Sequence, residues 1–141
     1  APPPFAQEPN HAIISTMLRG QMRGLLIGLA ILPHLYVTYT GLAATGPSAF
    51  LLGLLGWSLV PVAAGAALAY SRFRTQGVGW LLAVLVGSLW AIWVGLVRPK
   101  GSTASLIFLF MPLWNLVFVG PTGVLLTTLG RRLLTRRGIP S

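Results

Sequence analysis

Residues 78–97 read VGWLLAVLVGSLWAIWVGLV, an uncharged apolar stretch that decides the fold of this chain. A helix rises about 1.5 Å per residue, so about 20 such residues cross the hydrocarbon core of a bilayer. Small side chains recur at every fourth position and share one helix face: Gly79, Ala83, Gly87, Ala91 and Gly95. A ridge of this kind lets a second backbone approach closely. We therefore predict a transmembrane helix with a helix-packing face.

The composition of the whole chain agrees with this prediction. Its 141 residues are 55% hydrophobic and 8% charged, and the mean hydropathy is +0.79. A soluble domain carries about 25% charged residues. This chain has too few charges to cover a surface that faces water, so we expect an all-α integral membrane protein.

The charges that remain are almost all basic. Ten Lys and Arg residues stand against one acid, Glu8, for a formal net charge of +9. In a soluble protein this balance would indicate nucleic acid, but here the bases lie at the ends of apolar stretches, which favours membrane topology and anionic lipid. We expect no nucleic-acid partner. The chain has no cysteine, which excludes disulfides, thiolate metal sites and cysteine nucleophiles.

Breaker residues and apolar stretches divide the chain into segments. We predict a flexible Pro-rich arm at 1–9, an amphipathic helix at 10–23, four transmembrane helices at about 24–42, 50–70, 78–97 and 103–129 within a domain 24–130, and a basic tail at 131–141. The amphipathic helix either lies in the membrane interface or runs straight into the first span. Pro33 is expected to kink the first span, and Pro61 lies inside the second.

The fourth predicted span is longer than a straight perpendicular helix needs. It contains Pro112, Asn115 and Pro121, so we expect it to be kinked and tilted or broken near its middle. Gly130 is expected to end it.

The distribution of bases predicts the orientation. Eight lie on one side of the predicted spans (Arg19, Arg23, Arg72, Arg74, Arg131, Arg132, Arg136 and Arg137), and Arg98 and Lys100 lie on the other. Bases are enriched in cytoplasmic loops, so both termini are expected in the cytoplasm, in a bacterial inner or intracytoplasmic membrane. Either removal of an initiator Met or cleavage of a presequence would give a chain that begins at Ala1.

Several residues are candidates for contacts with partners. Gly20, Gly24 and Gly28 repeat the four-residue spacing on the first span, and the small residues at 63–69 are a plausible partner surface for the ridge at 79–95. Trp80, Trp90 and Trp93 are expected at the headgroup level. The C-terminal arginines Arg131, Arg132, Arg136 and Arg137 are expected to contact anionic lipid headgroups.

His34 is the most unusual residue inside a predicted span, where a histidine is costly unless it is paired. A neutral imidazole could bind the magnesium of a chlorophyll-type pigment or a haem iron. A single axial ligand suits a pigment better than a haem with two histidine ligands, because His11 is the only other histidine. The alternative is a histidine hydrogen-bonded to a hydroxyl, or to a carbonyl freed near Pro33. If the chain binds a cofactor, we expect a chlorophyll-type pigment; otherwise we expect none.

Asn115, between two prolines, suggests either an interrupted transporter helix or an amide bonded to a neighbouring helix. Catalysis is not expected, because Glu8 is the only carboxylate side chain and the two histidines are far apart. We expect a small non-catalytic accessory subunit of a larger membrane complex, photosynthetic or respiratory, that packs against other integral subunits. The alternatives are a homo-oligomeric channel or small transporter, and a membrane enzyme or assembly factor whose activity would depend on His34 or Glu8.

Overall fold

The computed structural model describes the backbone of residues 8–97 and 104–136 and the side chains of 14–95 and 109–136. These residues are helical apart from short turns, and they contain no strand. The helical segments are α1 (Glu8–Thr45), α2 (Ala49–Tyr70), α3 (Arg74–Val97), α4 (Ala104–Trp114), the π-helical turn η1 (Asn115–Val119) and α5 (Gly120–Arg136). Four helical stretches are long and apolar enough to cross a membrane: Ile14–Thr45, Ala49–Tyr70, Arg74–Gly95 and Leu109–Arg136. The prediction of an all-helical chain with four helices long and apolar enough to span a membrane is thus confirmed.

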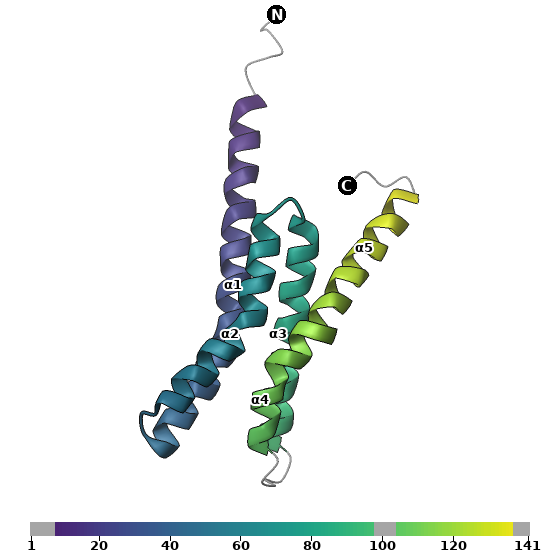
Figure 1. Cartoon of the computed structure of the whole chain (residues 1–141). Coiled ribbons are helices and arrows are strands. Elements are labelled where there is room, and N and C mark those ends of the chain that lie inside the picture. Colours follow the sequence, from purple (N-terminus) through teal and green to yellow (C-terminus); the bar gives the residue numbers. More distant parts are fainter. Residues whose placement is uncertain (1–7, 98–103, 137–141) are drawn as a thin grey trace, which may run out of the picture.

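The helices form an up-and-down bundle in which the start of α1, the α2–α3 turn and the end of α5 lie at the same end (Figure 1). We refer to this as the arginine end, because the elements there carry Arg19, Arg23, Arg72, Arg74, Arg131, Arg132 and Arg136. The opposite end, with the α1–α2 turn at 46–48, is the turn end. The orientation of these ends in a membrane stays a prediction. Residues 1–7 of the arm predicted at 1–9 lie outside the described residues, as do Arg98, Lys100 and Arg137. Residues 8 and 9 belong to α1, so the predicted arm is wrong at these two positions.

Local chemistry accounts for the turn between the first two helices. Gly46 has a φ of +79°, a left-handed conformation that suits glycine after a helix, and its N–H donates to the Leu42 carbonyl at 2.8 Å. Ser48 then begins α2, because its hydroxyl accepts a hydrogen bond from the Leu51 N–H at 3.2 Å. A turn this short holds α1 and α2 side by side.

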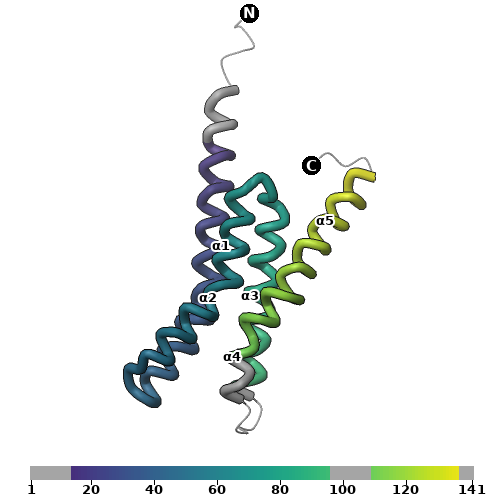
Figure 2. The backbone as a smooth tube through the Cα atoms, in the orientation of Figure 1, coloured from purple at the N-terminus to yellow at the C-terminus, as the bar shows by residue number. Residues whose placement is uncertain are grey.

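Pro33 lies inside α1 and Pro61 lies inside α2. Both helices change direction near their middle, and their halves at the turn end lean together away from α3 and α4 (Figure 2). Proline lacks the N–H that would continue the helix and its ring crowds the preceding turn, which explains the bends. The kink expected at Pro33 is therefore present, and α2 shares the bend at Pro61.

The last span is kinked but not broken. At η1 the Gly120 N–H donates to the Asn115 carbonyl five residues back, which widens one helical turn. Pro121 follows directly and has no N–H to give to Val117, so the wider turn forfeits no hydrogen bond at that position. The helix then continues through Gly130 to Arg136, and the prediction that Gly130 ends it is wrong. A single glycine costs a helix only about 1 kcal/mol relative to alanine.

Two other helix boundaries differ from the predicted ones. Residues 10–23 are the first part of one continuous helix, α1, so this segment runs straight into the first span. Whether it lies in the membrane interface stays a prediction. Helix α3 begins at Arg74, four residues before the apolar stretch, because polar residues extend a helix readily beyond the hydrocarbon region.

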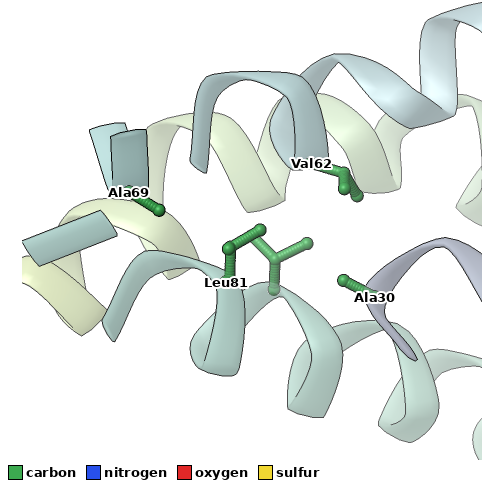
Figure 3. Packing of buried hydrophobic residues seen from close by; sticks show 5 residues of the cluster. Ala30, Val62, Ala69 and Leu81 are labelled. Carbon is green, nitrogen blue, oxygen red and sulfur yellow. The ribbon is translucent and has the colours of Figure 1, made fainter. Parts of the chain in front are cut away.

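The apolar core lies where α1, α2 and α3 meet. It is made of Ala30, Val62, Ala69, Leu81 and Val84, and Figure 3 shows Leu81 of α3 lying between residues of α1 and α2. Small residues on α1 and α2 leave room for one large side chain, so the three backbones approach closely. This cluster lies in the half of the bundle towards the arginine end, whereas Ala91 is buried separately, nearer the turn end.

The ridge of α3 is used inside the protein, and its partner is not the one expected. Gly79 and Ala83 pack against Gly123 of α5, where a Cβ on Gly123 would meet the Gly79 carbonyl oxygen and, at 2.8 Å, the Ala83 Cβ. The small residues of α2 contact a different face of α3: Gly65 lies against Leu81, and Ala69 lies against Gly77. The expected pairing of 63–69 with the ridge is therefore wrong, although α2 and α3 do pack together.

Candidate functional site

Three polar side chains from three helical segments meet inside the bundle. His34 of α1, Ser88 of α3 and Asn115 of η1 are 8%, 3% and 0% exposed. The Ser88 Oγ lies 3.5 Å from His34 Nε2, and Asn115 Nδ2 lies 3.5 Å from the same Oγ as a donor. A hydroxyl can donate one hydrogen bond and accept others. The Ser88 hydroxyl therefore links the His34 imidazole to the Asn115 amide.

Each member of this polar cluster is placed by local structure. His34 follows Pro33, where α1 bends. Ser88 follows Gly87 of the α3 ridge, and a Cβ on Gly87 would lie 3.0 Å from Asn115 Oδ1. Asn115 opens the π-helical turn. A glycine at 87 thus provides the space that the Asn115 amide occupies.

The cluster is only partly satisfied by hydrogen bonds. Both contacts to Ser88 are at the long limit for a hydrogen bond, and the buried Asn115 Oδ1 has no hydrogen-bond partner among the described atoms. An unpaired polar atom in a membrane interior is costly and marks a place where a protein keeps polarity for a reason other than stability.

A cavity of about 50 Å³ lies beside the cluster between α1, α2, α3 and α4. Its lining includes the polar residues His34, Thr38, Ser58 and Ser88. The Thr38 hydroxyl donates to the His34 carbonyl at 2.9 Å, and the Ser58 hydroxyl donates to the Leu55 carbonyl at 2.8 Å. Their oxygens can still accept hydrogen bonds, so the cavity offers polar partners to a small guest.

Of the two alternatives for His34, the structure contains the hydroxyl partner, Ser88. The proposed pigment ligand stays a prediction. The cavity is well below the roughly 300 Å³ of typical small-molecule pockets, so a macrocycle would require α1 and α3 to separate. Within residues 8–97 and 104–136, no group of three or more His, Cys, Asp or Glu residues is placed to hold a metal ion.

The predicted helix-packing residues fall into two groups. On α3, Gly79, Ala83, Gly87 and Ala91 face other parts of the chain, and Gly95 lies one turn further along the same helix. On α1, a Cβ at Gly20, Gly24 or Gly28 would meet no described atom within 4 Å. The ridge of α3 packs against other elements of the same chain, whereas the ridge of α1 contacts no described residue.

Two expectations about surface residues have different outcomes. Arg131, Arg132 and Arg136 are exposed on α5, and Arg131 donates to the Thr75 hydroxyl at 3.5 Å. Their contact with lipid stays a prediction. Trp80 turns inward instead of forming a surface belt, because its ring lies against Gly120 and its Nε1–H donates to the Pro61 carbonyl at 2.8 Å.

Sequence reasoning identified His34 and Asn115 but missed Ser88. The signal was present, because Ser88 is the only hydroxyl side chain in the stretch 78–97. Comparison of the chain with protein-family models, with curated proteins and with solved structures finds no match. Its function is therefore argued from its own residues.

Proposed function

We propose that this protein is a small non-catalytic subunit of a larger membrane protein complex. The observation that carries the proposal is the unused small-residue ridge of α1, formed by Gly20, Gly24 and Gly28, beside which no described atom lies within 4 Å. In a membrane, helices associate through close packing at small residues, since lipid gives no hydrophobic drive between them. A ridge that meets nothing within its own chain suits a helix of another subunit.

The uneven burial of the four spans supports the same proposal. Within the most apolar window of each span, 39% of residues are buried for α3 but only 11% for α1. Helix α3 thus forms the centre of the bundle, and α1 is attached at its edge with most of its surface outward. Its large apolar side chains there include Leu25, Leu29 and Leu32, which suit either lipid or a neighbouring helix.

The host that we propose is a photosynthetic or respiratory complex in a bacterial inner or intracytoplasmic membrane, with both termini of this chain in the cytoplasm. Support comes from the five Trp, three Tyr and six Phe residues and from the buried imidazole of His34. Aromatic rings and a neutral imidazole are compatible with a nearby pigment. Anionic lipids are proposed as further partners of Arg131, Arg132 and Arg136, at the arginine end.

The experiment that tests the proposal is purification from the native membrane in mild detergent, followed by mass spectrometry of the accompanying chains and a visible spectrum of the same fraction. We expect stoichiometric partner chains, with chlorophyll or haem bands. A colourless fraction that holds only this chain would contradict the proposal.

The double substitution Gly24→Leu and Gly28→Leu is expected to remove most of the partner from that fraction, while the chain itself stays folded. Two leucines would separate the helix surfaces that the glycines allow to touch, and a Cβ at either position meets no described atom within 4 Å. Gly53→Leu is the matched control on another helix, because a Cβ at that position of α2 also meets no described atom within 4 Å. Equal partner recovery from the double variant and the control would contradict the assignment of the α1 ridge.

A homo-oligomeric channel or small transporter is the second candidate. The observation that favours it is the buried polar cluster, in which Asn115 opens an interrupted helical turn. Reconstitution into liposomes separates the two candidates. A selective flux that Asn115→Leu abolishes would favour the channel, whereas the absence of flux from every oligomer would exclude it.

A further inference from the structure

The cavity beside His34 extends from the polar cluster towards the turn end. Its lining runs along α2 from Leu51, two residues after the helix begins, to Ser58. At about 1.5 Å per residue it reaches roughly 13 Å into the helix, or nearly half of a hydrocarbon core of about 30 Å. The shared bend of α1 and α2 lies near this depth, and the halves of both helices at the turn end lean away from α3 and α4 (Figure 1).

The inner end of the cavity is polar, and the layer beyond it is sealed. His34, Ser58 and Ser88 belong to three different helices and line the cavity together. Four residues from each, towards the arginine end, lie Ala30, Val62 and Val84, which are 0%, 3% and 0% exposed. A displacement of four residues is one helical turn on the same face. The polar layer is thus directly covered by the apolar core.

We propose that this cavity is a water-filled vestibule that opens at the turn end and ends blindly at His34 and Ser88. A volume of about 50 Å³ has room for roughly four water molecules. Each water can use the His34 imidazole, the Ser88 hydroxyl or the free acceptor capacity of Thr38 and Ser58. The long 3.5 Å contact between His34 and Ser88 leaves both groups able to bond water as well.

The vestibule is independent of the proposed role as an accessory subunit. It gives water access to one face of the His34 side chain. It also argues against a pore through a single chain, because Leu81 and Val84, both 0% exposed, lie on the far side of the polar layer. Any solute that reaches His34 must be of about the size of water or a small cation.

The absence of cysteine makes a direct test possible, because one introduced cysteine is the only thiol of this chain, whose labelling is read on its own gel band. Ser58→Cys places it in the vestibule with a change of a single atom. The full-length protein, with any partner that co-purifies, is reconstituted in sealed liposomes and treated with silver nitrate. Silver reacts with thiols where water allows the thiolate to form. The sample is then dissolved in SDS and treated with a maleimide. The fraction of chains whose thiol no longer reacts with the maleimide is the fraction that silver has modified.

The matched controls are Gly56→Cys and Val60→Cys, which bracket Ser58 in depth and lie at exposed positions of α2. We expect Ser58→Cys to react on the order of tenfold faster than both controls, and only with silver added on the side of the turn end. A reaction as slow as that of the controls would show a dry cavity and overturn the proposal. An equally fast reaction with silver added on either side would show that the cavity is not closed at His34 and Ser88, and this would overturn the proposal. Ala91→Cys, buried on α3 in the same lining, repeats the test if Ser58→Cys does not fold.

Discussion

Gly123→Ala is expected to lower the free energy of unfolding by about 2 kcal/mol or more, although it adds only a methyl group. The new Cβ would meet the backbone of Gly79, with its carbonyl oxygen closest and its carbonyl carbon at 2.8 Å. A flexible side chain could move aside, but a helix backbone cannot do so without separating α3 from α5. Gly79 and Gly123 bring the two backbones into close contact, so the strain spreads to both helices.

The measurement is SDS-driven unfolding in mixed micelles, followed by far-ultraviolet circular dichroism. The control is Gly28→Ala on α1, where a Cβ meets nothing within 4 Å. Since alanine favours a helix over glycine by up to about 1 kcal/mol, this control is expected to be neutral or slightly stabilising. A Gly123→Ala protein as stable as the Gly28→Ala protein would show that α3 and α5 do not cross at these glycines.

The contact between Gly79 and Gly123 also shows what could and could not be predicted from the sequence. The four-residue spacing of small residues is present on both α1 and α3, and on α3 it correctly indicates a face on which another helix packs. The spacing is the same whether the partner is a helix of the same chain or of another. Only the folded arrangement shows that Gly79 meets Gly123 while Gly24 and Gly28 meet nothing.

Helix boundaries were missed for a related reason. Hydropathy reports the stretch that lies in hydrocarbon, whereas a helix ends where its hydrogen bonding ends. Arg74, Thr75 and Gln76 lower the hydropathy at the start of α3 and are still helical. At the other extreme, Gly130 is permitted inside α5 because the helix formers around it compensate for its low propensity.

Two of the three residues of the polar cluster could be predicted from the sequence. His34 and Asn115 are conspicuous because polar side chains are rare in apolar spans. Ser88 is not, since a single serine in a membrane helix usually bonds its own backbone. Its role depends on the register of α3 against α1 and η1, which brings together residues 54 and 27 positions apart in the chain. No local pattern encodes that register.

Trp80→Ala is expected to have the largest effect of any single substitution considered, a loss of about 3 kcal/mol in the free energy of unfolding. Its indole lies where α2, α3 and α5 meet: a Cβ on Gly65 would come within 2.6 Å of its Cδ1, and one on Gly120 would overlap ring atoms at 2.5–2.6 Å. Unfolding within a micelle does not expose the ring to water, so the loss comes from packing and from its hydrogen bond.

Trp80→Phe separates these two contributions, because it keeps an aromatic ring against Gly65 and Gly120 but removes the N–H that donates to the Pro61 carbonyl at 2.8 Å. We expect a loss of about 1 kcal/mol from that change. Trp93→Ala is the control on the same helix, since this side chain is 59% exposed and its removal opens no internal space. If Trp80→Ala and Trp93→Ala unfold at the same SDS fraction, Trp80 is a surface aromatic after all, and α5 is not anchored to α2 through it.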